Sequence, residues 1–329
     1  MSSTDMGKLP KASRPTTATI RSRVVLEIAS ELVARADYPY QQAKVTMRLP
    51  RGERDWKLEL FGSGTKEGIE AVVRGTAKLA MTNPSASLSL AYHGKGLFKT
   101  PHPVRVIAVI PSYDQVLFGV RSDLGLRYIE DIAERRVPLR LSLRSEPDHW
   151  LHPMLDDILA ACGTSLADIE SWGGAIRRDG PLPNFGGPRF EPYHRGEIDS
   201  IFDESVTNWC NEAPPAGLTL LKMREETLRR LEDLGYRRGT LHRADFPNLP
   251  DDLDTLDFSG WPIFVRADAE DDFVTQVCEA LAARAHLIPW QSPGPLPVER
   301  MCRDAPDTPQ YVPLHPAAER TWRRLGYLP

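Results

Sequence analysis

The chain has 329 residues, a hydrophobic content of 41%, a charged content of 26% and a net charge of −4. A single hydrophobic core stops growing at about 250 to 300 residues, so this length predicts two lobes. The ordinary composition excludes a disordered or fibrous chain, and the scattered basic residues argue against a nucleic-acid partner. The four cysteines form no CxxC pair, which argues against a zinc ribbon or a thioredoxin-like redox site. No cofactor is expected.

The start of the chain is polar. The first 18 residues lack the apolar run that a secretory signal requires, so we expect a flexible tail over 1–18 and a cytoplasmic protein. No stretch of about 18 apolar residues occurs anywhere, and no membrane span is expected.

Hydrophobic periodicity predicts alternating helices and strands. Apolar residues recur at three- and four-residue spacing within 20–36, which is one face of an amphipathic helix. Short apolar segments predict strands at 46–49, 56–61, 77–82, 104–110, 115–121, 138–143, 198–202 and 262–266. Helical spacing predicts further helices at 66–74, 150–159, 225–234, 271–286 and 316–325. Nearly continuous apolar strands between helices predict mostly parallel sheets that are buried on both faces.

The segment 172–192 is rich in glycine and proline, and we predict that it is a loop.

Polar residues at the ends of predicted strands are the candidate binding residues, because open parallel sheets bind ligands beyond the carboxyl ends of their strands. The first group precedes the helix at 66–74, where free backbone N–H groups favour an anion; the alternative is a plain helix cap. The second group follows the strand at 77–82. The third follows the strand at 138–143. The first group is Ser63, Gly64 and Thr65, the second is Asn83 and Ser85, and the third is Arg144 and Ser145.

Arg144 is the candidate carboxylate ligand, because a guanidinium pairs bidentately with a carboxylate. Its alternative role is a surface ion pair with Glu146.

Two carboxylates, Asp203 and Glu204, follow the strand at 198–202, and Trp209 lies shortly beyond them. Such a pair binds a hydroxyl or amine, coordinates a cation or transfers a proton; the alternative is a cap on the next helix. His149 and His152 are three residues apart and would share a helical face. They lack an HExxH context, so we expect no metal site.

Ordered segments resemble the solute-binding proteins of TAXI-type TRAP transporters. They are GSGTKEGIEAVVRGTAKLAMTNPSASLSLAYHGKGLF (62–98), VRVIAVIPSYDQVLFGVRSDLGLRYIEDI (104–132), YHRGEIDSIFDE (193–204) and PLHPAAERTWRRLGY (313–327). The resemblance covers roughly residues 58–329. It implies an α/β, type II periplasmic-binding-protein-like fold with two lobes and a ligand cleft between them. Lobe I would comprise 19–118 and 222–329, and lobe II 119–221.

The resemblance also implies ligand contacts at the strand-end residues named above and a small anionic, carboxylate ligand. Two features depart from the family: no export signal opens the chain, and 16–22 carries no Gly-rich, Tyr-bearing loop. The first departure argues against partnership with the membrane subunits of a transporter. We therefore expect a small-molecule binding protein. The alternative is an enzyme on the same fold, a decarboxylase or other lyase, with His149, His152, Asp203 and Glu204 as its candidate acids, bases or metal ligands.

Overall fold

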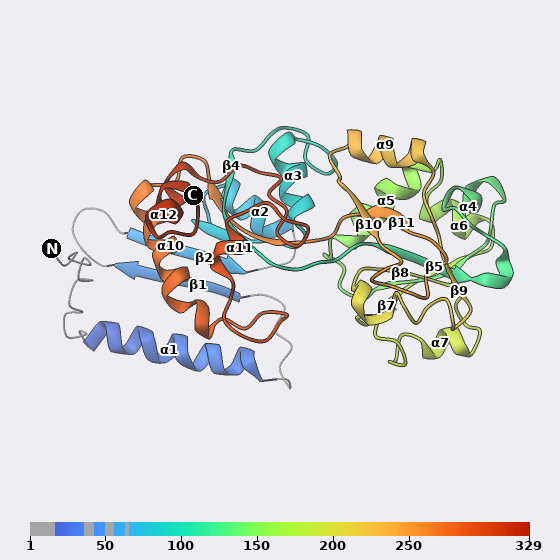
Figure 1. The fold of residues 1–329 in the computed structure, drawn as a ribbon, viewed down its shortest axis with the longest axis horizontal. Helices are drawn as coiled ribbons and strands as arrows, with labels where there is room; N and C mark the ends of the chain where they lie inside the picture. Colours follow the sequence, from blue (N-terminus) through green and yellow to red (C-terminus); the bar gives the residue numbers. More distant parts are fainter. Residues whose placement is uncertain (1–16, 36–42, 50–55, 63–65) are drawn as a thin grey trace. The chain divides into compact units, whose positions relative to one another are not determined.

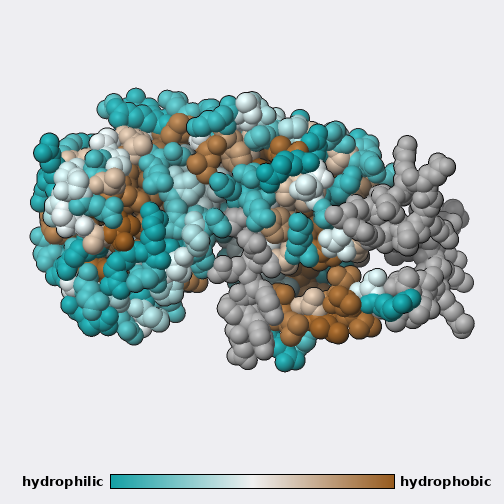
Figure 2. All heavy atoms as spheres, turned by 180° about the vertical axis from the view of Figure 1, so that it is seen from behind, coloured by the Kyte–Doolittle hydropathy of each residue, from teal (hydrophilic) through white to brown (hydrophobic). Residues whose placement is uncertain are grey.

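The computed structural model describes residues 17–35, 43–49, 56–62 and 66–329 (Figure 1). The chain divides into two units, Met1–Ala43 and Lys44–Pro329, and each is described by itself. The first unit holds the helix α1 (Thr17–Ala34), which confirms the helix predicted there. Its apolar side chains gather along the helix in Figure 2. In the described part of the chain, no helix is long and apolar enough to cross a bilayer.

The first sheet has five strands in the order β1-β2-β3-β12-β4. Strands β2 and β3 run parallel, whereas β12 runs antiparallel to both of its neighbours. The strands of this sheet are β1 (Ala43–Leu49), β2 (Trp56–Gly62), β3 (Leu79–Met81), β4 (Val104–Ile110) and β12 (Trp261–Arg266). Buried residues of β4 and β12 pack against the last helix, where the Trp322 indole donates to the carbonyl of Ile107 at 2.8 Å.

The second sheet has five strands in the order β7-β6-β8-β5-β9. Strands β7, β6 and β8 are parallel, and β5 runs antiparallel to β8 and β9. The strands of this sheet are β5 (Leu117–Arg121), β6 (Arg140–Arg144), β7 (Ala175–Gly180), β8 (Ser200–Asp203) and β9 (Leu218–Leu220). A separate antiparallel pair consists of β10 (Arg238–Leu241) and β11 (Leu253–Leu256).

Helices flank both sheets (Figure 1). Those near the first sheet are α2 (Lys66–Val73), α3 (Ser85–His93), α10 (Asp271–Arg284), η2 (Ala285–Leu287), α11 (Val298–Met301) and α12 (Pro316–Arg324). Those near the second sheet are η1 (Ser122–Leu124), α4 (Glu130–Glu134), α5 (Leu151–Ala161), α6 (Leu166–Ser171), α7 (Glu191–His194), α8 (Val206–Trp209) and α9 (Glu225–Asp233). The predicted α/β architecture with two helix-flanked sheets is confirmed.

Two segments connect the sheets. Residues 111–116 lead from β4 to β5, and residues 257–260 lead back from β11 to β12. The segments are hydrogen-bonded to each other, because the Phe258 N–H donates to the carbonyl of Asp114 at 2.9 Å and the Ser259 hydroxyl donates to the same carbonyl at 2.9 Å. This double crossing places polar residues of both segments where the sheets meet.

The structure adds detail that the hydrophobic pattern did not show. Each sheet is mixed, because the strand that follows a crossing segment is antiparallel to its neighbours. This strand is β12 in the first sheet and β5 in the second. The predicted loop at 172–192 was wrong over 175–180, where β7 pairs in parallel with β6. This edge strand is rich in charged residues and partly exposed, so it lacks the apolar run that predicts a strand. Leu241 and Leu253, from β10 and β11, share a core cluster with Leu117 of the second sheet.

Candidate functional site

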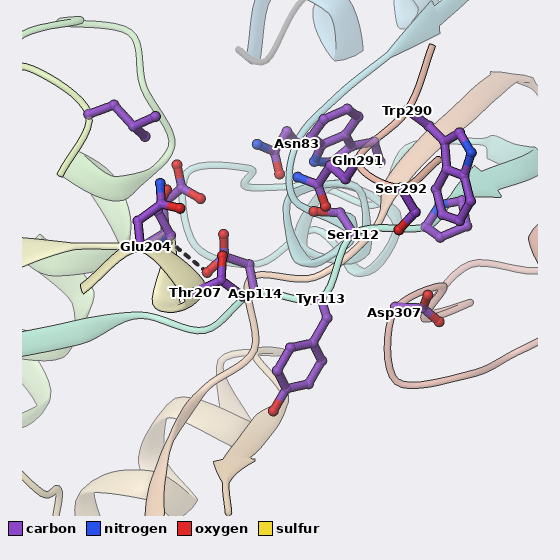
Figure 3. Close-up of a pocket in the computed structure, with 15 residues that line it drawn as sticks. Asn83, Ser112, Tyr113, Asp114, Glu204, Thr207, Trp290, Gln291, Ser292 and Asp307 are labelled. Atoms are coloured by element: carbon purple, nitrogen blue, oxygen red, sulfur yellow. Dashed lines mark hydrogen bonds between the residues drawn. The ribbon is translucent and has the colours of Figure 1, made fainter. Parts of the chain in front are cut away.

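A pocket of about 600 Å³ lies where the crossing segments pass between the sheets (Figure 3). Three described parts of the chain line it. The crossing segment supplies Pro111, Ser112, Tyr113 and Asp114. The second-sheet side supplies Leu182, Glu204, Ser205, Thr207 and Asn208. The first-sheet side supplies Asn83, Trp261, Trp290, Gln291, Ser292 and Asp307.

Asp114 organises the crossing side of this pocket. Its Oδ1 accepts hydrogen bonds from the backbone N–H groups of Gln115 at 2.9 Å, Ser205 at 2.8 Å and Val206 at 3.1 Å. The last two bonds tie the crossing segment to the start of α8. They also hold Ser205 in the left-handed region at φ 66°, a conformation that costs a non-glycine residue about 1 to 3 kcal/mol.

Glu204 stands beside Asp114 on the same wall (Figure 3), and each of the two buried carboxyl groups shifts the pKa of the other. Burial and the Glu204 charge raise the pKa of Asp114 well above its usual 3.8. Burial alone would raise the pKa of Glu204 as well, but the neighbouring Asp114 carboxyl and the charge of Arg144 outweigh it and lower that pKa. Two adjacent buried carboxyls favour one shared proton, and the opposite directions of their pKa shifts indicate that Asp114 holds it.

Behind this wall lies a buried ionic network. The Arg144 guanidinium donates to Asp203 at 2.5 and 3.2 Å and to Glu204 at 2.8 Å. Arg189 donates to the same Asp203 carboxylate and to the carbonyl of Ser142 at 3.0 Å. The Arg144 side chain is 6% exposed, that of Arg189 1% and that of Asp203 0%. Two arginines and two carboxylates therefore neutralise each other inside the second sheet, and Asp114 adds a further carboxyl to the group.

The two histidines take different positions. His149 Nε2 lies 3.9 Å from the Glu204 carboxylate, and burial followed by the charge of Arg144 lowers the pKa of this imidazole. His152 is held by the carbonyl of Glu146 at 2.9 Å and by Arg178 at 3.0 Å. Neither residue lines the pocket. Across the described residues, no group of three or more His, Cys, Asp and Glu side chains is arranged to hold a metal ion.

The predicted binding residues are distributed unevenly around this pocket. Asn83 and Glu204 line it. Arg144 and Asp203 form the ionic network behind it, and Trp209 is fully buried in the core of the second sheet. Ser85 is buried beside Gly260, and Ser145 is exposed next to Glu146. Ser63, Gly64 and Thr65 lie outside the described residues.

The crossing segment was not among the predicted binding residues. Ser112, Tyr113 and Asp114 directly follow the predicted strand at 104–110, and this polar ending was a usable signal. Trp290, Gln291 and Ser292 offered none, because they lie in a Pro-rich connection with no periodic pattern.

We expect the variant Asp114→Asn to gain stability relative to the parent protein as the pH rises above about 4. Asp114 has a raised pKa in the folded protein, so its contribution is fully present below the unfolded value of about 3.8 and is lost as the pH rises through the folded value. Asparagine does not titrate and still accepts the bonds to Ser205 and Val206. Urea unfolding of both proteins across this range measures the difference, and a constant difference would contradict the assignment.

No protein-family model and no curated protein matches the chain. Among solved structures, PhnD1 from Prochlorococcus marinus, in complex with methylphosphonate, is 14% identical, with 80% of this chain and 83% of that chain covered and a TM-score of 0.38. A TctC solute-binding protein from Polaromonas is 15% identical, with 66% and 68% covered and a TM-score of 0.32.

A protein of Bordetella bronchiseptica is 14% identical, with a TM-score of 0.36; 68% of this chain matches 59% of that chain's length. The resemblance to TAXI receptors stays a prediction.

Proposed function

We propose that the chain is a small-molecule binding protein whose ligand occupies the pocket at the crossing segments. The observation that carries the proposal is the origin of the lining, which comes from both sheets and from the segment that joins them. The volume of about 600 Å³ falls within the range of small-molecule sites. Aromatic surfaces from Trp261 and Trp290 combine there with a few convergent polar groups, which is the usual composition of such sites.

The test is a thermal-shift screen of the purified protein against organic acids, amines, alcohols and sugars, followed by calorimetry on each hit. We expect at least one compound to raise the unfolding midpoint, because a ligand that binds only the folded state stabilises it. Mass spectrometry then checks whether the compound is recovered unchanged. Conversion to a product would favour the alternative of a lyase.

A pocket-filling variant locates the binding. Ser292 is exposed and lines the pocket, so Ser292→Trp should fill it without disturbing the core and weaken binding at least tenfold. Ser171 is an exposed serine at the end of α6 that does not line the pocket, and Ser171→Trp serves as the matched control. Equal binding by both variants would place the ligand elsewhere.

The sequence predicted carboxylate recognition. Arg144, its predicted partner, is occupied by Asp203 and Glu204, and the loop at 63–65 lies outside the described residues. The ionic network supports a structural role for Arg144. We expect Arg144→Ala to lower the free energy of unfolding more than it changes the affinity for any carboxylate. Urea unfolding measures the first quantity and calorimetry measures the second.

A further inference from the structure

The charge of the pocket lining is one-sided. Of the fifteen described residues that line the pocket, Asp114, Glu204 and Asp307 carry carboxyl groups, and none is lysine, arginine or histidine. The three carboxyls come from three separate segments: the crossing, the end of β8 and the connection before α12. A lining of this kind favours a ligand that brings positive charge.

The carboxyls differ in how they are compensated. Glu204 is paired with Arg144 at 2.8 Å, and Asp307 with Arg300 at 2.8 Å. Asp114 is 7% exposed and takes part in no ion pair among the described residues. A buried carboxyl group that has no cation beside it either stays protonated or binds a cation, because an unpaired buried charge has a high free energy. Asp114 is therefore the uncompensated group of this wall.

Other lining groups match the same kind of ligand. The Asn83 amide oxygen is buried without a hydrogen-bond partner, so it is an acceptor that still requires a donor. Trp261 and Trp290 offer aromatic faces, and cations bind to the face of an indole. The volume of about 600 Å³ exceeds what an inorganic ion needs and suits an organic molecule.

We propose that the pocket binds an organic cation, an ammonium or guanidinium group, at the Asp114 and Glu204 carboxyls, and that binding releases the proton these two groups share. The step balances: one proton leaves Asp114 as one positive charge arrives, so the net charge of the site is unchanged. This inference rests on the proposed function and adds the ligand class.

Other charged groups face the carboxyl pair. Arg144 of β6 and His149, ahead of α5, lie on the Glu204 side, together with Asp203 of β8. The low pKa of His149 keeps this imidazole neutral near pH 7, and Arg144 stays charged beside its two carboxylates. Asp114 is accordingly the group that exchanges a proton when a cation arrives.

The probes are matched triplets of an amine, a carboxylic acid and an alcohol on one carbon skeleton, for example 2-phenylethylammonium, 3-phenylpropionate and 2-phenylethanol. Skeletons of increasing size are screened by thermal shift and calorimetry. We expect the amine to bind at least tenfold more tightly than its acid and alcohol in every skeleton that binds, a difference of about 1.4 kcal/mol. Acids or alcohols that bind equally well or better would overturn the cation class and leave the proposed function standing.

Proton release is measured by calorimetry over a series of pH values above about 4, in buffers of different ionisation enthalpy. We expect release approaching one proton per amine in the parent protein and none in Asp114→Asn, whose amine affinity should fall at least tenfold. Asp245→Asn is the matched control, because Asp245 is an exposed carboxylate that lines a different pocket. Equal proton release by the parent protein and Asp114→Asn would remove Asp114 from the mechanism.

Two further outcomes are decisive. Stabilisation by Ca²⁺ or Mg²⁺ alone to the extent seen with amines would make the site an inorganic-cation site and overturn the organic class. If no triplet and no other screened compound binds, the proposed function and this inference both fail. Glu204→Gln, which should also weaken amine binding, provides a second variant if Asp114→Asn does not fold.

Discussion

Replacing Asp203 by asparagine is expected to lower the free energy of unfolding by about 3 to 5 kcal/mol, because the change removes one partner of a buried ion pair and leaves the other charge uncompensated. Asp203 accepts hydrogen bonds from both Arg144 and Arg189, whose side chains are 6% and 1% exposed. Asparagine has nearly the same shape, so the loss reports on charge and not on volume. Urea unfolding measures it, since a neutral denaturant does not screen ion pairs.

Asp179 provides the matched control. Its carboxylate pairs with Arg177 at 2.9 Å, but the side chain is 61% exposed. Exposed pairs contribute about 0 to 1 kcal/mol, so Asp179→Asn should change stability little. If Asp203→Asn costs no more than this control, the network does not hold the second sheet together.

Removal of the Trp209 side chain is the second large effect that we expect. Trp209→Ala should cost about 3 to 5 kcal/mol, because the indole is fully buried and the vacated volume cannot be refilled. The ring packs over Gly119, where an added Cβ would approach it to 3.1 Å, and its Nε1 donates to the carbonyl of Glu204 at 2.8 Å. Trp209→Phe keeps most of the volume and should cost less. Urea unfolding compares the variants.

Trp290 is the contrasting tryptophan. It is half-buried and lines the pocket, so Trp290→Ala should weaken ligand binding with a smaller loss of stability. A large loss of ligand affinity in Trp209→Phe, with stability retained, would return Trp209 to the binding residues predicted from the sequence. Calorimetry on the same samples gives both quantities.

The sequence alone determined the local elements and the general architecture. Apolar runs such as 104–110 and the three- and four-residue spacing within 20–36 are local patterns, and the structure has β4 and α1 there. The polar ends of strands pointed to the region around Asn83 and Glu204, because strand direction places these ends at one edge of a sheet. The charged edge strand β7 was missed, since pairing at an edge needs no apolar pattern.

Only the tertiary structure decided the partners. Arg144 and Asp203 are 59 positions apart in the sequence. Asp114 lies in the connection from β4 to β5, whereas Glu204 follows β8, so no local sequence pattern relates the members of either pair. From the sequence, Arg144 was predicted to bind a carboxylate ligand. In the structure, the parallel pairing of β6 with β8 places the Arg144 guanidinium beside two carboxylates of this chain, those of Asp203 and Glu204. The double crossing then brings Asp114 to the same wall without a cation of its own. The sequence shows which side chains are charged, but the ion-pair partner of each depends on which strand ends the fold brings together.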